Sequence, residues 1–372
     1  MEPQLIKKYL KYAAGLIILI LVVCAVGYFI YKNIIPVISP QENVSQIQKG
    51  VDLSQVPVTF VEGKPLPEKP FDFKGTLYLS LMKINGQYAL GIYAFNIERV
   101  IGSRFTTILA SKISKDGNYY INISPSVSMD GKTLVFARKN MNTPALQIFT
   151  SGISGENIHQ ITNTPDRYKR EPVFSPSGEL IAYISHNTKS SANDPDPEIP
   201  ESWSTYLTDI KGNAVRVADG VNPIFSPDGK KLLVLQNDGL HAFDISVWTK
   251  PEHLGLVVKT VGGRASAMMK IGVSADGKMI AWPSVSKNNV IVSQINSWDK
   301  FSISPLLVIE TKAYWSVFSP DGKYLAVCEW RKDDTGNEYP IIMGYDLSNG
   351  KSGKIVTLIS DDKSYLWFGA WK

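Results

Sequence analysis

The sequence predicts an all-β fold, a six-bladed β-propeller, preceded by one transmembrane α-helix. Three observations predict the propeller: a hairpin motif that recurs, a four-strand unit built around it, and two chain ends that complete each other. The motif is clearest at 317–327, Val-Phe-Ser-Pro-Asp-Gly-Lys-Tyr-Leu-Ala-Val, with a near copy at 224–234 and looser copies at 126–135, 173–182 and 272–281. The motif glycines lie 47, 51, 48 and 45 residues apart, which is the spacing of a repeat architecture: Gly131, Gly178, Gly229, Gly277 and Gly322.

Each copy of the motif predicts a tight β-hairpin. The residues before the serine are β-branched or aromatic, as in a buried strand. In Ser-Pro-Asp-Gly, proline presets φ, aspartate hydrogen-bonds to nearby backbone, and glycine accepts a positive φ. A second apolar run follows the glycine. Because both strands are apolar, the hairpin needs neighbours stacked against it, and radial repetition supplies them.

The remainder of each unit predicts two more strands. In 146–162, two β-rich runs flank a glycine-containing turn at 151–155, and the same scheme recurs at 204–218 and 341–358. Four strands per unit make one propeller blade.

The two ends of the chain predict the sixth blade. Residues 365–371 resemble 312–318, the first strand of the preceding unit, but stop before any turn. Residues 76–81 form a second strand that follows Gly75 with no first strand before it. We therefore expect the C-terminal strand to close the first blade, so that 75–372 is the propeller and no sheet edge stays open.

The N-terminal region predicts a membrane anchor and a tether. Residues 13–31 carry no charge, and an apolar run of this length is enough for a membrane-spanning helix within 12–31. Lysines precede this run and only Lys32 follows closely, so residues 1–11 are expected in the cytoplasm and the propeller in the periplasm or outside the cell. Residues 32–74 contain repeated prolines and predict an extended tether. The alternative is a cleaved signal peptide with a weak site at 25–27, which would release a secreted propeller.

Composition argues against several other classes of protein. The formal charge is +5, so no nucleic-acid partner is expected. The two cysteines, Cys24 and Cys328, lie in unrelated segments and predict no disulfide. The four histidines show no metal-ligand spacing and are expected to be scattered on the surface: His159, His186, His241 and His253. No cofactor is predicted.

The Ser-Pro-Asp-Gly repeats resemble the PD40 (WD40-like) repeats of TolB-type six-bladed propellers over about four-fifths of the chain. The resemblance implies a bacterial cell-envelope protein that works by protein–protein contact. TolB proteins carry a small α/β domain before the propeller, and in this chain the predicted helix and tether stand in its place.

The sequence favours a binding protein over an enzyme. Similar propellers cap serine hydrolases, but no Gly-x-Ser-x-Gly pentapeptide occurs and no segment remains for a hydrolase domain, so no catalytic residue is predicted. Two acidic loops contain calcium-type ligands but lack EF-hand spacing, so we expect solvated loops and no metal: Asp194, Asp196 and Glu198, and Asp333, Asp334, Asn337 and Glu338. The alternative is an enzyme, or a sugar- or ion-binding propeller, that uses the central channel.

The repeats also predict where a protein partner binds. All Ser-Pro-Asp-Gly turns share one face, where the tether arrives, and the opposite face carries the longest loops, 186–202 and 331–339. Residues that begin each first strand should ring the channel mouth on that opposite face: Ile123, Arg170, Asn222, Lys270, Tyr314, Trp315 and Trp367. Alternatively, these aromatic residues pack between blades. The recurring motif residues are expected to be structural only: Phe174, Phe225, Phe318, Trp371, Pro176, Pro227 and Pro320.

Overall fold

The computed structural model describes most of the repeat region. The described residues are 73–84, 87–97, 105–110, 120–140, 145–164, 168–186, 203–259, 270–284, 288–311, 313–332, 338–350, 352–357 and 367–372. The chain divides into two units, Met1–Gln48 and Lys49–Lys372, and every described residue belongs to the second. The predicted cytoplasmic segment, transmembrane helix and nearly all of the tether lie outside these residues. Across the ranges just given, no helix combines the length and hydropathy that a membrane crossing needs.

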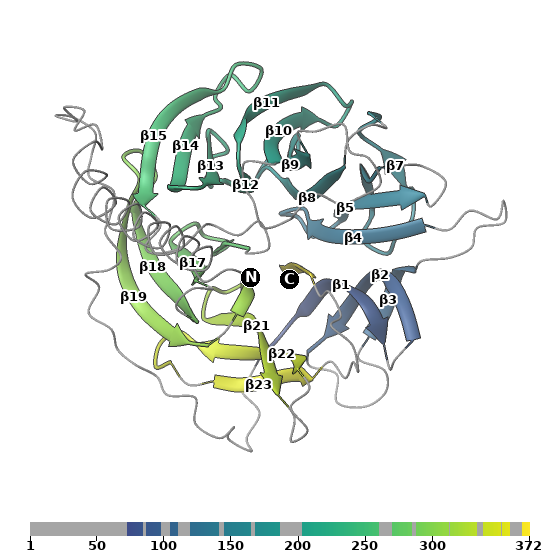
Figure 1. Cartoon of the computed structure of the whole chain (residues 1–372), viewed down its shortest axis with the longest axis vertical. Coiled ribbons are helices and arrows are strands. Elements are labelled where there is room, and N and C mark those ends of the chain that lie inside the picture. The colour runs from purple at the N-terminus through teal and green to yellow at the C-terminus, as the bar shows by residue number, and fades with distance from the viewer. Residues whose placement is uncertain are drawn as a thin grey trace, which may run out of the picture. The chain divides into compact units, whose positions relative to one another are not determined.

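Six four-stranded antiparallel sheets surround a central axis, as Figure 1 shows, so the predicted propeller is confirmed. Blade 1 contains β24 (Trp367–Trp371), β1 (Thr76–Ile84), β2 (Gln87–Asn96) and β3 (Phe105–Ala110). Blade 2 contains β4 (Tyr120–Val127), β5 (Thr133–Asn140), β6 (Gln147–Gly152) and β7 (His159–Gln160). Blade 3 contains β8 (Lys169–Phe174), β9 (Leu180–His186), β10 (Trp203–Asp209) and β11 (Ala214–Asp219).

The other three blades follow the same order from the axis outward. Blade 4 contains β12 (Val221–Phe225), β13 (Lys231–Gln236), β14 (Gly239–Asp244) and β15 (Glu252–Lys259). Blade 5 contains β16 (Gly272–Val273), β17 (Met279–Ser284), β18 (Asn289–Ser297) and β19 (Ser302–Glu310). Blade 6 contains β20 (Ala313–Phe318), β21 (Tyr324–Lys332), β22 (Glu338–Asp346) and β23 (Ser352–Thr357).

The chain ends close the ring as the sequence predicts. β24 is the innermost strand of blade 1 and pairs antiparallel with β1, with Trp371 opposite Leu77. The Thr76 N–H donates to the Lys372 carbonyl at 2.5 Å, and the Lys372 N–H donates to the Thr76 carbonyl at 2.9 Å. Blade 1 therefore consists of one C-terminal and three N-terminal strands, and the pairing removes an exposed sheet edge.

The motif turns are held by a serine and an aspartate acting together. In blade 4, the Ser226 hydroxyl donates to Asp228 Oδ1 at 2.5 Å and accepts the Lys231 N–H at 2.9 Å. The Asp228 carboxylate also accepts the Lys230 N–H at 3.1 Å. The same contacts occur in blades 2, 5 and 6, at Ser128/Asp130, Ser274/Asp276 and Ser319/Asp321. These bonds satisfy the turn's backbone donors without help from another blade.

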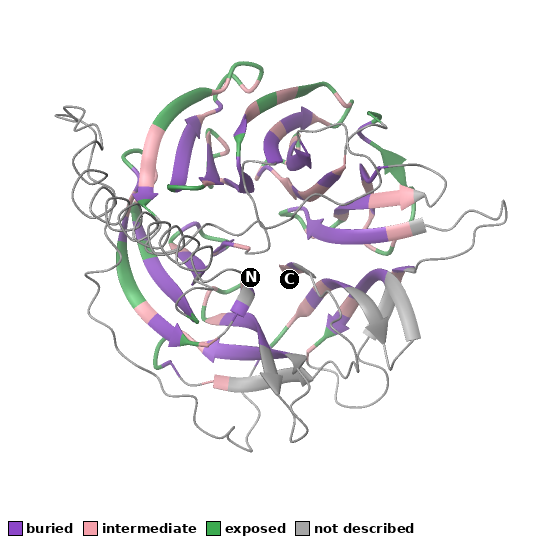
Figure 2. Ribbon diagram, viewed as in Figure 1, coloured by how far each residue is buried: buried purple, intermediate pink, exposed green. Residues whose placement is uncertain are grey.

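The core lies between adjacent blades. Blades 1 and 2 bury Ile92, Leu109, Leu134 and Phe136 against each other, and equivalent clusters fill the other interfaces. Figure 2 shows the resulting pattern, with buried residues along the inner strands and exposed residues on the outer strands such as β15 and β19. The surface expectation for the histidines is wrong at His186 and His241, which are buried.

Candidate functional site

The described residues enclose a central cavity of ≈ 470 Å³ around the propeller axis. All six innermost strands, or the turns that follow them, contribute to its lining. A volume of this size is typical of a site that holds a small molecule or a few side chains of a partner. The cavity is thus the feature to which every blade contributes a residue.

The cavity is open at the end where the Ser-Pro-Asp-Gly turns lie. Its lining there includes exposed residues: Met129, which is 52% exposed, and Pro227, Ala275 and Pro320. The described chain also starts at this end, where Phe73 is buried against Tyr324 and Trp371 at ring-centroid distances of 5.0 and 6.2 Å. The sequence predicts a partner at the opposite face, whose two longest loops lie mostly outside the described residues.

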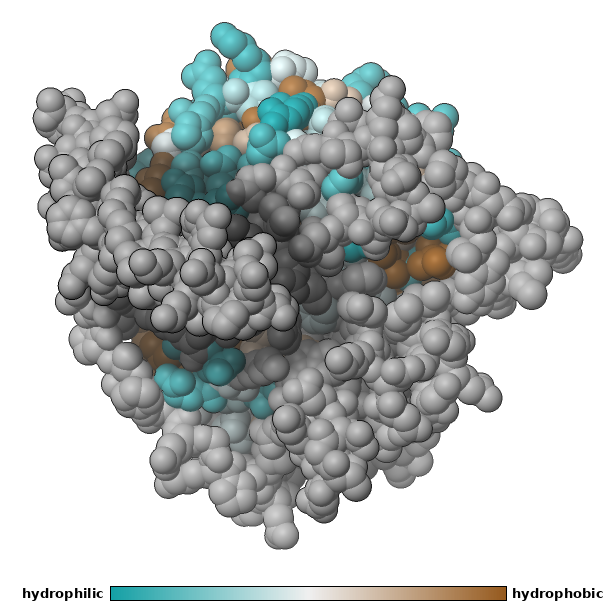
Figure 3. Space-filling model, in the orientation of Figure 1, coloured by the Kyte–Doolittle hydropathy of each residue, from teal (hydrophilic) through white to brown (hydrophobic). Residues whose placement is uncertain are grey.

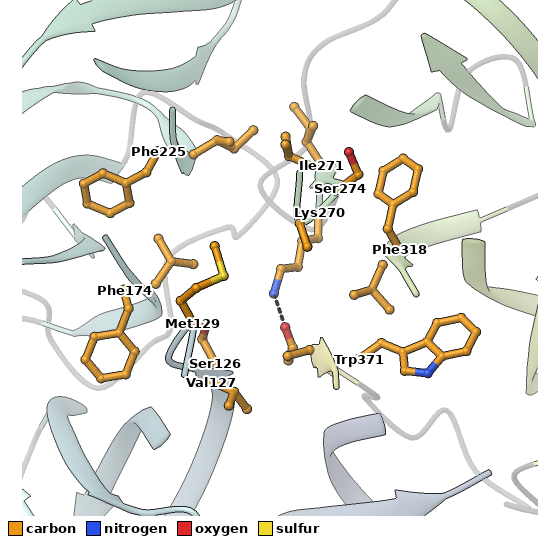
Figure 4. Close-up of a pocket in the computed structure, with 18 of the residues that line it drawn as sticks. Ser126, Val127, Met129, Phe174, Phe225, Lys270, Ile271, Ser274, Phe318 and Trp371 are labelled. Atoms are coloured by element: carbon orange, nitrogen blue, oxygen red, sulfur yellow. Dashed lines mark hydrogen bonds between the residues drawn. The ribbon is translucent and has the colours of Figure 1, made fainter. Parts of the chain in front are cut away.

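Four recurring aromatic residues stand on the strands around the cavity, and Figure 4 shows their rings turned away from its centre: Phe174, Phe225, Phe318 and Trp371. Each also packs into a cluster between blades, as the sequence predicts. Phe318 and Trp371 are buried there, and Phe174 and Phe225 are half-buried. The cavity lining also includes three half-buried valines, Val173, Val273 and Val317. On the described part of the face shown in Figure 3, hydrophilic residues predominate and hydrophobic ones are interspersed among them.

A local distortion of the first strands places polar side chains at the inner end of the cavity. Ser124, Glu171 and Asn222 have left-handed φ values of 51°, 51° and 54°, and each directly precedes a proline. Each lies at an irregularity in the pairing of its strand. Such a bulge redirects a side chain that regular strand geometry would point elsewhere. Counting back four residues from the motif serine places Lys270 of blade 5 at the same position.

Three polar residues from neighbouring blades therefore meet in the cavity lining: Glu171, Asn222 and Lys270. We call this set the cavity floor. The Lys270 Nζ donates to the Gly369 carbonyl at 3.1 Å, the bond that is dashed in Figure 4. The Asn222 Oδ1 accepts the Ile271 N–H at 3.1 Å. These bonds connect blade 4 to blade 5 and blade 5 to blade 1.

The electrostatics of the cavity floor are unusual for a carboxyl group. Burial raises the pKa of Glu171 to about 7, although the Lys270 ammonium and the Arg170 guanidinium nearby act in the opposite direction. Burial lowers the pKa of Lys270, and the Glu171 carboxylate opposes that shift. A glutamate that titrates near neutrality inside a cavity is the kind of group found at binding and catalytic sites.

The structure brings together only some of the predicted site residues. Asn222 and Lys270 line the cavity. Arg170 lies beside Glu171 on β8, with its guanidinium 5.5 Å from the Trp203 ring. Trp315 is buried between blades 6 and 1, which is the alternative given for the aromatic residues. Ile123 is likewise buried, between blades 2 and 3. Tyr314 and Trp367 lie on β20 and β24, and their side chains are outside the described set.

Glu171 was not among the residues predicted for the site. The available signal was the X-Pro pair, since Glu171-Pro172 stands in phase with Ser124-Pro125 and Asn222-Pro223. Since proline inside a sheet is confined to edges and bulges, these X-Pro pairs indicate an irregular position in each first strand.

The described part of the chain contains no group of three or more His, Cys, Asp or Glu residues arranged to hold a metal. This observation does not cover the two acidic loops that the sequence offers as possible calcium sites. Asp194, Asp196 and Glu198 lie outside the described residues, as do Asp333, Asp334 and Asn337. Glu338 begins β22, but its side chain is not described.

No protein-family model matches this chain. It is similar to the Tol-Pal system protein TolB of Francisella tularensis, subspecies tularensis and mediasiatica, at 31% identity over 84 residues. That match covers 23% of this chain and 18% of the relative, so the chain spans about a fifth of the curated relatives that it matches.

Solved structures extend the likeness to the whole propeller. TolB from Acinetobacter baumannii is 20% identical with a TM-score of 0.51, covering 76% of this chain and 64% of that one. The periplasmic gluconolactonase PpgL of Pseudomonas aeruginosa is 12% identical with a TM-score of 0.46, covering 80% and 100%. At these identities the likeness shows the fold. The chain is a six-bladed β-propeller that is distantly related to TolB over part of its length.

Proposed function

We propose that this chain is a membrane-anchored, extracytoplasmic β-propeller of the cell envelope, and that it binds a segment of another protein in its central cavity. The observation that carries the proposal is the cavity itself, which is open at the turn end and lined by apolar residues from all six blades. The partial similarity to TolB, a Tol-Pal system protein, supports an envelope role. The anchor rests on the apolar segment at 12–31.

The cavity wall has the composition of a binding surface. Methionine is enriched at protein interfaces, and Met129 stands at the open rim with half of its surface exposed. The scaffold beneath is rigid, because most lining residues belong to a paired strand or to a hydrogen-bonded turn. A rigid apolar cavity favours a segment that inserts a few large side chains rather than a flat contact.

A matched pair of photo-cross-linker positions tests the proposal. A photoreactive phenylalanine replaces Met129, which is 52% exposed at the cavity rim, or Ile210, which is 53% exposed at the β10–β11 turn outside the cavity. In native membranes we expect a discrete cross-linked protein from position 129 and none from position 210. Purification of that protein and direct titration should then show weaker binding to Phe225→Ala. Equal cross-linking at both positions, or none at 129, overturns the proposal.

The second candidate is a propeller that uses the same cavity for a small ligand or for catalysis. The near-neutral pKa of Glu171 beside Lys270 favours it, because such a pair can exchange a proton with a bound molecule. A panel of lactone, ester and glycoside substrates assayed with wild type and Glu171→Gln separates the two candidates. Turnover that Glu171→Gln abolishes supports the enzyme, and no turnover with a cross-linked partner at 129 supports the scaffold.

A further inference from the structure

Two histidines of blade 4 meet through their ring nitrogens. His241 Nδ1 on β14 and His253 Nε2 on β15 are 2.9 Å apart. The two rings are inclined by 25° and their centroids are 5.1 Å apart, so the nitrogens meet edge to edge. The lone pair of one nitrogen and the N–H of the other therefore point at the same place between the two strands.

Strand pairing brings the two rings together. His253 lies opposite Phe243 in the ladder, and His241 is two residues from Phe243 on the same face of β14. Diagonal neighbours of this kind lie within reach of aromatic side chains. The His253 ring packs on Phe243 at a centroid distance of 4.9 Å, and Phe243 is itself buried against blade 3. A buried ring thus sets the position of an exposed histidine.

Asp238 orients His241 from the other side of its ring. The Asp238 Oδ1 lies 2.8 Å from His241 Nε2. Because an ionised carboxylate only accepts hydrogen bonds, this contact assigns the proton to Nε2 and leaves the lone pair on His241 Nδ1. The His241 side chain is buried, so the ring is held in this orientation. A histidine whose second nitrogen donates to a carboxylate has the arrangement that is usual for a metal ligand.

His253 supplies a second nitrogen from the surface. It is exposed on β15, the outermost strand of blade 4. Burial of part of the ring and the neighbouring His241 lower the pKa of His253, although Asp238 acts in the opposite direction, so the ring is neutral at pH 7. The neutral imidazole is the form that binds metals.

The spacing of the two nitrogens suits an ion after a small movement. Two zinc–nitrogen bonds of about 2.0–2.1 Å at a tetrahedral angle place their nitrogens about 3.3 Å apart. The observed separation of His241 Nδ1 and His253 Nε2 is 2.9 Å. Since His253 is exposed on an edge strand, rotation of its side chain provides the difference.

We propose that His241 and His253 bind a divalent transition-metal ion, which takes the place of the proton between their nitrogens. That proton moves to His253 Nδ1, so both ligands stay neutral. Imidazole suits zinc, copper and nickel, whereas magnesium and calcium prefer oxygen ligands. Asp238 is a positioning residue that holds His241 and does not contact the ion. The site has two protein ligands, fewer than the groups of three that the described residues lack, and water completes the coordination.

Calorimetric titration of the untagged 372-residue chain in detergent at pH 7 tests the site with Zn²⁺ and Mg²⁺. Zn²⁺ should bind and Mg²⁺ should not. His253→Gln should weaken Zn²⁺ binding at least about tenfold, because loss of even a positioning group costs about 10–100-fold. His159→Gln, at an exposed histidine of β7, is the matched control and should bind like wild type. Equal Zn²⁺ affinity in wild type and His253→Gln, or Mg²⁺ binding as tight as Zn²⁺ binding, overturns the proposal.

Electron paramagnetic resonance with Cu²⁺ counts the ligands directly. Hyperfine structure should show two imidazole nitrogens in wild type and one in His253→Gln. Asp238→Asn should weaken Zn²⁺ binding about 10–100-fold but keep the two-nitrogen signal, since it loses orientation and not a ligand. A single nitrogen in wild type contradicts the paired site, and unchanged Zn²⁺ affinity in Asp238→Asn contradicts the positioning role.

The metal site and the proposed function can fail separately. Neither histidine is among the described residues that line the central cavity. A failed metal titration therefore leaves the cross-linking result at position 129 as it stands, and a failed cross-link leaves the histidine pair as it stands.

Discussion

The indole Nε1 of Trp371 donates a hydrogen bond to the backbone carbonyl of Lys74 at 2.6 Å, joining residues that are 297 positions apart. The same indole is buried in a cluster with Leu77, Trp315 and Ala326, so it touches blades 1 and 6. Trp371, the penultimate residue of the sequence, thus holds the first described residues of the propeller in place. The stability of the whole ring should depend on this contact.

Deletion of residues 365–372 should lower the melting temperature by about 5 °C or more, since loss of one buried tryptophan alone costs about 3–5 kcal/mol. The deletion removes β24 and exposes the edge of β1. Thermal unfolding and limited proteolysis of the purified chain measure the effect. Trp371→Phe is the matched mild variant, which keeps an apolar ring and should lose about 1 kcal/mol with the hydrogen bond. A truncated chain that melts like the intact one contradicts the closure.

Two glycines at motif-turn positions should differ in their tolerance of alanine. Gly75 has φ +99°, and a Cβ there would lie 2.4 Å from the Lys372 carbonyl oxygen. Gly131 has φ +74°, with nothing within 4 Å of its Cβ position. Gly131→Ala should cost about 1–2 kcal/mol from the left-handed backbone alone. Gly75→Ala should cost clearly more in urea unfolding, because the closing strand must also move, and equal losses would argue against that close approach.

The stability of the propeller should depend on pH through Glu171. Because burial raises the pKa of this carboxyl to about 7, its protonated form favours the folded state. That contribution is fully present below the usual glutamate pKa and is lost as pH rises through about 7. Glu171→Gln should therefore gain stability over wild type between pH 5 and pH 8 in urea midpoints. Glu179→Gln, at an exposed glutamate of the same blade, is the control. A constant difference across this range would count against the floor electrostatics.

The stability that the motif aspartates contribute should be lost as pH falls, which is the opposite pH dependence to that of Glu171. For Asp228, burial would raise the pKa, but the Ser226 hydroxyl and the Lys230 N–H outweigh it and lower the pKa. Its contribution is present above the usual aspartate pKa and is lost as pH falls through the folded value. Asp228→Asn should thus be less stable than wild type at pH 6 and approach it near pH 3. Blade 3 allows the converse substitution, because Ser177 occupies the position of the motif aspartate in its turn. Ser177→Asp should raise the unfolding midpoint at pH 6, and a fall would show that the turn chemistry does not transfer between blades.

Much of the fold could be predicted because its signals are local. Ser226 and Asp228 hold their own turn with bonds that span at most five residues, so a turn of this sequence forms wherever it occurs. The phase of the repeats fixed the blade count, and the unpaired strands at 76–81 and 365–371 indicated the closure. The histidines show the limit of such reasoning. His241 and His253 lie 12 residues apart, and their ring nitrogens meet at 2.9 Å only because β14 and β15 pair.

The sequence by itself determined the blade, its turns and the way in which the ring closes, because each depends on residues near one another or on a pattern repeated in phase. Only the tertiary structure decided the site. Glu171, Asn222 and Lys270 are about 50 residues apart in the chain, and no local rule brings their side chains together. They meet because bulges in the first strands redirect side chains and the ring places those strands around one axis. The pKa of Glu171 follows from that enclosure and from cations on two blades, which are properties of the assembled propeller.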